Sequence, residues 1–284
     1  MKIVLNYPTR LDNNSYVARS KMNKRPNDKP LLLDLFCCAG GAARGYQRAG
    51  FYVVGVDNEK QPHYCGDEFY QADALQFIQD HWREFDAIHA SPPCQFHTRM
   101  NKGLLQAQKR NKVHPDLIEP TRRALIETGL PYVIENVVGA PLVNPIQLCG
   151  SSFGLMVERH RLFESNIFLM SIPCAHGWQK FDKPPLHSMN GHRKAALSRV
   201  YGVYGNGRGK GETVAAWSIA MGIDWMNRYE LTQAIPPAFS EFVGVQLMNV
   251  LNVEKPHNTA WSRLVQGTGI LPAVVNQSRI EKPA

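Results

Sequence analysis

Residues 31–57, LLLDLFCCAGGAARGYQRAGFYVVGVD, decide the fold of this chain of 284 residues. The apolar run LLLDLF predicts a short buried strand, AARGYQRAG predicts a helix that ends at Gly50, and FYVVGVD predicts a second buried strand. A helix that joins two buried strands at this spacing is typical of a parallel sheet. The segment is therefore predicted to be a strand–helix–strand crossover.

The same alternation continues along the chain. ALQFIQDHW (74–82) predicts an amphipathic helix, and DAIHA (86–90) predicts a third strand. PDLIEPTRRALIETG (115–129) is helical in pattern apart from Pro120, and LPYVIENV (130–137) predicts another buried strand. We therefore expect an α/β fold with a doubly wound, mostly parallel sheet.

The composition is that of a globular protein, with 44% hydrophobic and 20% charged residues. No stretch approaches the ~20 apolar residues of a membrane span, and the polar start MKIVLNYPTRLDNN does not resemble a secretory signal. The six cysteines form no CxxC pair, which favours reduced thiols. We expect a cytoplasmic protein without a membrane partner.

The formal net charge of +8 favours a polyanionic partner. Lys and Arg side chains that neutralise phosphates release counterions, and this release drives binding to nucleic acid. The alternative is a soluble protein that is merely basic.

Polar residues follow the predicted strands, at the edge where doubly wound sheets bind ligands. Gly40 and Gly41 allow a ligand close to the backbone, although such a pair is often only a tight turn. Asp57 follows Asp34 at close to the ~20-residue offset of ribose-binding acids. Because the glycines do not form GxGxxG, the pattern favours a nucleoside ligand such as S-adenosylmethionine. Asp73 is a candidate for the adenine amino group or, alternatively, a helix cap.

Cys94 stands behind two prolines in SPPCQ, directly after the third predicted strand. Because proline fixes φ and restricts the residue before it, the turn presents the thiol rigidly, as a nucleophile requires. The alternative for a single cysteine is an inert buried thiol.

Glu135 ends a buried strand, where a carboxylate is costly unless it is paired or used. In the usual strand order these two residues lie across one crevice.

Four motifs, in this order and spacing, resemble those of the cytosine-5 DNA methyltransferases. They are DLFCCAGG (34–41), SPPCQ (91–95), IENV (134–137) and ERHRLF (158–163). The resemblance runs from about Leu31 to Phe163 and resumes weakly in NRYELTQAIPPAFSEFVG, so it covers more than half of the chain.

The resemblance implies four catalytic residues. Cys94 would be the thiolate that adds to C6 of cytosine, and Glu135 would assist at N3 and the exocyclic amine. Arg159 and Arg161 would hold the base and the nucleophile region; alternatively, they are solvated charges on a strand.

The resemblance also implies the cofactor S-adenosyl-L-methionine and double-stranded DNA from which the target base is flipped out. The residues expected at the cofactor are Phe36, Gly40, Gly41, Asp57, Asp73 and Pro93. Cys38 stands where the family usually has a glycine, and Asp57 stands where relatives often have a glutamate. The region available for target recognition is also short.

The expected organisation has five parts. They are a basic arm (1–29), a cofactor-binding catalytic domain (30–165), a small target-recognition region (166–225), closing helices (226–252) and a tail (253–284). Basic and aromatic residues of the recognition region suit phosphates and bases; they are Trp178, Arg193, Lys194, Arg199, Tyr201, Tyr204, Arg208 and Lys210. Cys174 and His176 supply only two ligands of the four that zinc needs, so we expect no metal.

Two alternatives keep the fold. One branch of the family methylates cytosine in transfer RNA, and a catalytically silent DNA-binding protein could also use this scaffold. We expect a monomer in a bacterial or phage-infected cell, with any restriction endonuclease partner on a separate chain.

Overall fold

Seven strands form one sheet in the computed structural model of the protein, which describes residues 29–93, 116–176, 200–203 and 213–254. The strands are β1 (Leu31–Leu35), β2 (Tyr52–Asp57), β3 (Glu68–Gln71), β4 (Ala87–Ala90), β5 (Tyr132–Asn136), β6 (Ile146–Cys149) and β7 (His160–Ser165). Their spatial order is β3-β2-β1-β4-β5-β7-β6. The first five strands are parallel, and β7 is antiparallel to both β5 and β6.

The predicted α/β fold with a doubly wound, mostly parallel sheet is confirmed. The chain adds β2 and β3 on one side of β1 and then crosses to β4 on the other side. The edge strands β3 and β6 were not predicted. Each has four residues and is partly exposed, so neither gives the continuous apolar run by which buried strands are recognised.

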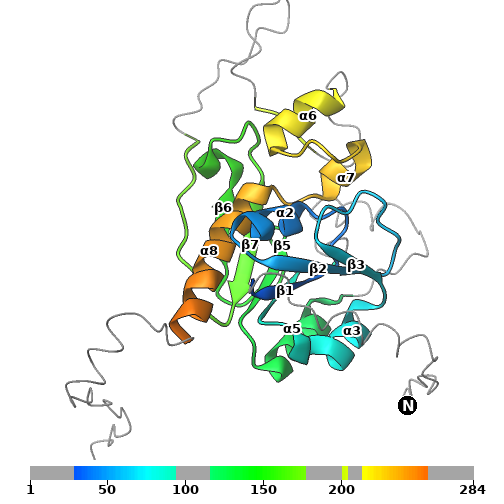
Figure 1. The fold of residues 1–284 in the computed structure, drawn as a ribbon. Coiled ribbons are helices and arrows are strands. Elements are labelled where there is room, and N and C mark those ends of the chain that lie inside the picture. The colour runs from blue at the N-terminus through cyan, green and yellow to red at the C-terminus, as the bar shows by residue number, and fades with distance from the viewer. Residues whose placement is uncertain (1–28, 94–115, 177–199, 204–212, 255–284) are drawn as a thin grey trace, which may run out of the picture.

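Helices cover both faces of the sheet (Figure 1). They are α2 (Gly41–Arg48), α3 (Ala74–His81), α5 (Ile118–Thr128), α6 (Val214–Met221), α7 (Arg228–Gln233) and α8 (Pro237–Glu254), with short 3₁₀ turns η2 (Trp82–Glu84) and η3 (Gly150–Phe153). Helices α2 and α8 pack on one face, and α3 and α5 pack on the other.

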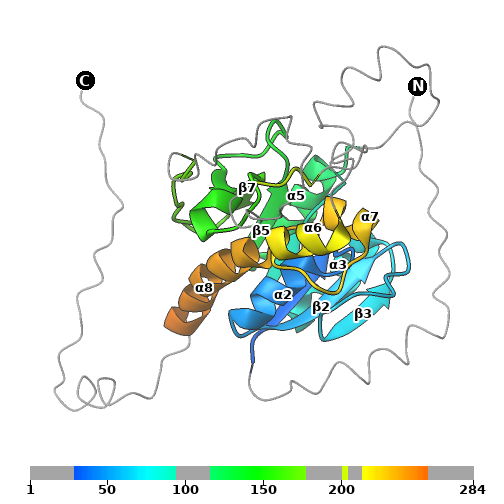
Figure 2. The same ribbon diagram turned by 90° about the horizontal axis from the view of Figure 1, so that it is seen from above.

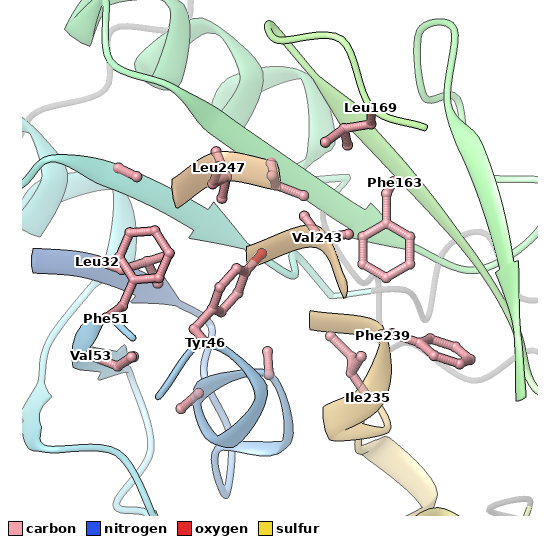
Figure 3. Close-up of a cluster of buried hydrophobic side chains, with 14 of the residues drawn as sticks. Leu32, Tyr46, Phe51, Val53, Phe163, Leu169, Ile235, Phe239, Val243 and Leu247 are labelled. Carbon is pink, nitrogen blue, oxygen red and sulfur yellow. The ribbon is translucent and has the colours of Figure 1, made fainter. Parts of the chain in front are cut away.

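The face under α2 and α8 holds a large apolar cluster, which Figure 3 shows with side chains from β1, α2, β7 and α8. Helix α8 lies so close to α2 that a Cβ on Gly45 would come within 2.1 Å of Ser240 Oγ and 2.2 Å of the Pro237 carbonyl oxygen. The end of the described chain is therefore part of the core, because α8 covers apolar residues of the first strand and helix.

The opposite face is filled by apolar residues of β1, β2, β4 and β5 against α3 and α5. Helix α5 begins at Ile118, later than the pattern predicted, and Pro120 lies in its first turn. A proline is tolerated there because the first N–H groups of a helix have no partner within the helix.

A third cluster lies beyond the sheet, where α6 and α7 are neighbours in both views (Figure 1 and Figure 2). Trp217 and Met221 of α6 pack in it with Ala39 of the loop after β1 and with Val203. Within the described ranges, no helix combines the length and the apolar character that crossing a membrane requires. Nearly all of the predicted N-terminal arm and C-terminal tail lies outside these ranges.

Candidate active site

The carboxyl ends of β1, β2, β4 and β5 lie side by side, because these strands are parallel neighbours. Phe36 follows β1, Asp57 ends β2, Pro92 and Pro93 follow β4, and Glu135 is close to the end of β5. Ligands of open α/β sheets bind outside this edge, where the direction of winding reverses between β1 and β4. The structure thus brings residues from four segments to one edge.

The loop after β1 contains three residues in the left-handed region, Phe36 (φ 58°), Cys38 (φ 44°) and Gly40 (φ 82°). This conformation costs residues other than glycine about 1–2 kcal/mol. The Cys38 N–H donates to Asp57 Oδ2 at 3.0 Å, which holds the loop against β2. Cys38, which stands where the resembling family usually has a glycine, therefore adopts a backbone conformation that favours glycine.

Gly40 and Gly41 are required for contacts within the protein itself. A Cβ on Gly40 would lie 3.0 Å from Cys65 Sγ, and one on Gly41 would lie 2.5 Å from the Ile235 carbonyl oxygen. These positions therefore serve close packing and a tight turn. Gly40 offers no side-chain cap to the first amides of α2.

Asp57 is 7% exposed and accepts two backbone hydrogen bonds, from Cys38 N to Oδ2 and from Glu59 N to Oδ1, both at 3.0 Å. An ionised carboxylate has roughly four acceptor positions. One acceptor position therefore remains on each of the two carboxylate oxygens of Asp57. This arrangement suits a pair of neighbouring hydroxyl groups such as those of a ribose.

Asp73 caps helix α3, since its Oδ1 accepts the Gln76 N–H at 2.9 Å. The helix-cap interpretation of this residue is therefore observed. A capping carboxylate retains acceptor capacity, and Asp73 lies directly beyond the carboxyl end of β3, so the cap is compatible with a second role.

Asn136 connects the end of β5 to the turn after β4. Its side chain is 1% exposed, Nδ2 donates to the Pro92 carbonyl at 2.9 Å, and Oδ1 accepts the Val137 N–H at 2.9 Å. The double-proline turn is thereby fixed against the strand that carries Glu135. Cys94, the predicted nucleophile, lies two residues beyond Pro92 and outside the described residues.

Glu135 and Arg161 form an ion pair on the neighbouring strands β5 and β7. Arg161 Nε lies 2.9 Å from Glu135 Oε1, although its N–H does not point at the oxygen as in a good hydrogen bond. Both side chains are largely buried, at 16% and 7% exposure. Burial raises the pKa of the Glu135 carboxyl, and Arg161, Ser91 and Arg159 partly oppose this rise.

Arg159 lies next to β7 and is 5% exposed. Its Nη1 donates to the Val203 carbonyl at 2.9 Å, and its Nη2 donates to the Thr232 carbonyl at 2.7 Å. Of the two predicted arginines, Arg161 thus contacts the predicted catalytic carboxylate, while Arg159 holds backbone segments on either side of α6.

Asp34, inside β1, was not predicted as a site residue. It is 1% exposed, and among the described residues neither carboxylate oxygen has a hydrogen-bond partner. Burial raises its pKa well above the ordinary value, with further contributions from Asp57 and Glu135. The signal that could have found it is one acid within the buried run LLLDL. Such a carboxylate suits a cationic ligand group.

A buried hydrogen-bonded chain leads from α2 to the site. Tyr46 Oη lies 2.9 Å from His89 Nδ1, and His89 Nε2 lies 2.9 Å from Ser91 Oγ. Ser91 in turn hydrogen-bonds to Glu135. His89 is fully buried, and burial lowers its pKa to about 3, so the ring is neutral near pH 7.

Most residues predicted to read the target lie outside the described ranges. These are Trp178, Arg193, Lys194, Arg199, Tyr204, Arg208 and Lys210. Tyr201 is described; its N–H donates to the Met156 carbonyl at 2.8 Å, and it pairs with Val157 in a β-bridge. The part of this region around Tyr201 is therefore attached to the segment that precedes β7.

A surface pocket lies at the amino end of the strands, lined by residues that include Asp86, Pro131 and Asn166. It contains none of the predicted site residues, and doubly wound sheets bind ligands at the opposite edge. We assign it no function.

The strand order defines a Rossmann-like α/β fold with polar residues at the carboxyl edge of its sheet. Similar solved structures include the Schizosaccharomyces pombe Dnmt2 methyltransferase, with 13% identity, a TM-score of 0.49 and coverage of 79% of this chain and 100% of that one. An Escherichia coli prophage protein described as a DNA modification methyltransferase has 15% identity, a TM-score of 0.48 and the same coverages.

An Entamoeba histolytica methyltransferase, EhMeth, has 12% identity and a TM-score of 0.45 over 80% of this chain and 99% of its own. Neither a protein-family model nor a curated protein sequence matches the chain. With identities this low, the similar structures do not by themselves assign an activity.

Proposed function

We propose that the chain is an S-adenosylmethionine-dependent DNA (cytosine-5-)-methyltransferase. The observation that carries the proposal is the hydrogen bond from Asn136 to the Pro92 carbonyl. It joins the turn that leads to Cys94 to the strand that carries the buried Glu135. This contact supports a single proposed site for the motif of the thiol nucleophile and that of the buried carboxyl group.

The residues at the carboxyl edge fit S-adenosylmethionine by the chemistry of their donors and acceptors. Asp57 has acceptor positions for two ribose hydroxyls, and Asp73 can accept a hydrogen bond from an adenine amino group. Within the described part of the chain the buried carboxyl group of Asp34 has no hydrogen-bond partner, which suits the positively charged methionine end. Phe36 and Pro93 offer apolar surface at the same edge. When bound, this cofactor supplies an electrophilic methyl group.

Cys94 is proposed to add as a thiolate to C6 of the target cytosine, forming a C–S bond. The addition makes C5 nucleophilic, so that C5 can take the methyl group as the carbon–sulfur bond of the donor breaks. Loss of the C5 proton and departure of the thiolate from C6 then restore the ring. The fixed Pro92–Pro93 turn orients the nucleophile throughout.

Glu135 is proposed to protonate or strongly hydrogen-bond N3 while charge develops on the ring. Its raised pKa keeps a transferable proton available at a higher pH than an exposed glutamate would. Arg161, at 2.9 Å, limits this rise and orients the carboxyl group. The chain through His89 and Ser91 supports Glu135 from the interior side.

Double-stranded DNA is the proposed substrate, with the target base flipped out because C5 and C6 cannot be reached within the helix. The net charge of +8 supports a polyanionic partner. We propose a monomer that acts in the cytoplasm of a bacterial or phage-infected cell. Any restriction endonuclease that recognises the same target would be a separate chain.

The test is transfer of labelled methyl from S-adenosylmethionine to duplex DNA, with transfer RNA presented in parallel. DNA that contains 5-fluorocytosine should trap a covalent complex, and mass spectrometry should place the adduct on the Cys94 peptide. The Cys94→Ser variant should form no adduct. Undiminished methyl transfer by this variant would contradict the mechanism.

Two other outcomes have separate meanings. Methylation of transfer RNA but not of DNA would move the same chemistry to RNA. Binding of DNA without measurable binding of S-adenosylmethionine would indicate a silent scaffold. Bisulfite sequencing of DNA from cells that express the protein would report activity and target sequence together.

A further inference from the structure

We propose that Cys149, His160, Cys174 and His176 form a structural zinc site, separate from the proposed catalytic residues. One ligand atom from each side chain lies within 4.8 Å of the corresponding atom of every other member. Two thiols and two imidazoles are the donor set of closed, four-coordinate zinc sites. The proposal does not depend on the proposed methyl transfer.

The distances between donor atoms are close to those around a tetrahedral ion. Cys149 Sγ lies 3.0 Å from His176 Nε2, and Cys174 Sγ lies 3.4 Å from His160 Nε2. Zinc–sulfur and zinc–nitrogen bonds of about 2.3 and 2.1 Å at a tetrahedral angle separate the two donors by about 3.6 Å. The two separations differ from this value by about 0.6 and 0.2 Å, and no pair of donors exceeds 4.8 Å, so movements of about 1 Å or less would place all four donors around one ion.

Two of the four proposed ligands belong to strands of the sheet. Cys149 ends β6 and His160 begins β7, and the antiparallel register places these two residues opposite each other. Cys174 and His176 come from the segment that follows β7 and returns to the same edge. Two ligands are thus held by paired strands, and the other two attach a connecting segment to them.

Polar groups around the cluster support thiolate ligands. Ser151 Oγ donates to Cys149 Sγ at 3.1 Å and accepts the Ala175 N–H at 3.1 Å. Gln147 Nε2 lies 3.9 Å from Cys174 Sγ. Donors of this kind orient metal ligands and stabilise their charge. The Ser151 contacts also bring the segment that carries Cys174 to the end of β6.

The chemistry of the four ligand atoms indicates which metal ion the site would bind. Thiolate and imidazole favour zinc, whereas calcium and magnesium require oxygen ligands. Two thiolates balance the charge of a divalent ion, so the site would add no net charge beside Arg159 and Arg161, which flank His160. With four protein ligands, no position remains for a substrate or an activated water, and this is the arrangement of structural sites.

The proposed ion would anchor the start of the target-recognition region. The chain continues from His176 into residues 177–199, where the sequence analysis places base-reading side chains. One ion would therefore join the segment that carries Cys174 and His176 to β6 and to the strand that carries Arg161. The proposal replaces the expectation of no metal, which counted Cys174 and His176 but not the two ligands contributed by the strands.

The direct test is metal analysis of the full chain, purified without an affinity tag or chelator. We expect about one zinc per chain. After removal of zinc, Co²⁺ should bind with a thiolate-to-cobalt charge-transfer absorption and the visible bands of a tetrahedral complex. A wild-type protein that contains no zinc and gives no such absorption with Co²⁺ would overturn the proposal.

Variants separate coordination from a general effect on folding. Cys174 is exposed, so Cys174→Ser should fold while losing more Co²⁺ affinity than the roughly 10–100-fold loss caused by changes around a metal site. Cys174→His, which restores a ligand atom, should retain the ion. Cys65→Ser and His81→Gln are controls outside the cluster and should keep zinc. Wild-type metal affinity in Cys174→Ser would also overturn the proposal.

Discussion

Asn136 donates a hydrogen bond from its buried side-chain amide to the Pro92 carbonyl at 2.9 Å. This contact joins two segments that are 44 positions apart and fixes the orientation of the turn that leads to Cys94. Because proline has no backbone N–H, the turn depends on carbonyl acceptors for such attachments. Asn136 is therefore a positioning residue for the proposed nucleophile.

The first prediction concerns this contact. Asn136→Ala should lower kcat by about 10–100-fold, because a small misplacement of the nucleophile has an effect of that size. The KM for S-adenosylmethionine should change less than kcat, since every proposed cofactor residue except Pro93 lies on another segment. Steady-state kinetics with each substrate varied would measure the split. A rise in this KM with unchanged kcat would contradict the positioning role.

The second prediction concerns Glu135. Removing its transferable proton in Glu135→Gln should lower kcat about 100-fold or more. Since burial raises the pKa of this carboxyl, the wild-type rate should fall as the pH rises through that pKa and the proton is lost. This alkaline decline should be missing in the variant. A pH–rate profile of each protein provides the measurement, and identical profiles would exclude the proposed role.

The third prediction concerns Cys38, one of the residues with left-handed backbone conformation in the loop after β1. Cys38→Gly should raise the free energy of unfolding by about 1 kcal/mol, because glycine adopts a φ of 44° without the penalty of a side chain. Cys38→Ala is the matched control; it removes the thiol, keeps Cβ and should show no gain. Urea unfolding of the three proteins distinguishes these cases. A gain of equal size in Cys38→Ala would attribute the effect to the thiol.

The fourth prediction concerns the pH dependence of stability. The pKa of His89 is about 3 in the folded protein and near 6.5 when the ring is solvated, so the unfolded chain binds more protons between these values. Stability should therefore decrease as the pH falls below 6.5, by up to about 1.4 kcal/mol per pH unit. Urea unfolding at several pH values should show a smaller slope for His89→Gln. Equal slopes would mean that other groups cause the loss.

The fifth prediction concerns the contact between α2 and α8. Alanine favours a helix over glycine by about 1 kcal/mol, yet Gly45→Ala should destabilise the protein by about 1–3 kcal/mol. The reason is that the added Cβ would overlap Ser240 and the Pro237 carbonyl. Arg48→Ala, on the exposed side of α2, should change stability by less than about 1 kcal/mol. Thermal unfolding would compare both variants with the wild type.

Much of the fold follows from local sequence patterns. The buried strands β1, β2, β4 and β5 are mostly apolar runs, and the helices between them have a clear period. The short edge strands and the antiparallel direction of β7 were not predicted. Both depend on pairing with residues far away in the chain, to which a local hydrophobic pattern is insensitive.

The candidate site was predicted unevenly. Glu135 was found because an acid at the end of an apolar run is costly, and Asp57 was found from its offset from Asp34. The structure places both at the carboxyl edge. Asp34 was missed although it is an acid within the buried run LLLDL; that it has no hydrogen-bond partner among the described residues is visible only in three dimensions. Gly40 and Gly41 are needed for packing against Cys65 and Ile235, which sequence distance conceals.

The sequence by itself determined the order of the central strands, the helices between them and the polar residues at their ends. These properties follow from the alternation of apolar and polar residues over a few positions. Only the tertiary structure decided that Cys149 faces His160 across two antiparallel strands and that Asn136 reaches Pro92. Such contacts depend on the register of the strands and on the path of the chain between them. Both are set by the packing of the whole core, which brings together residues that are distant in sequence.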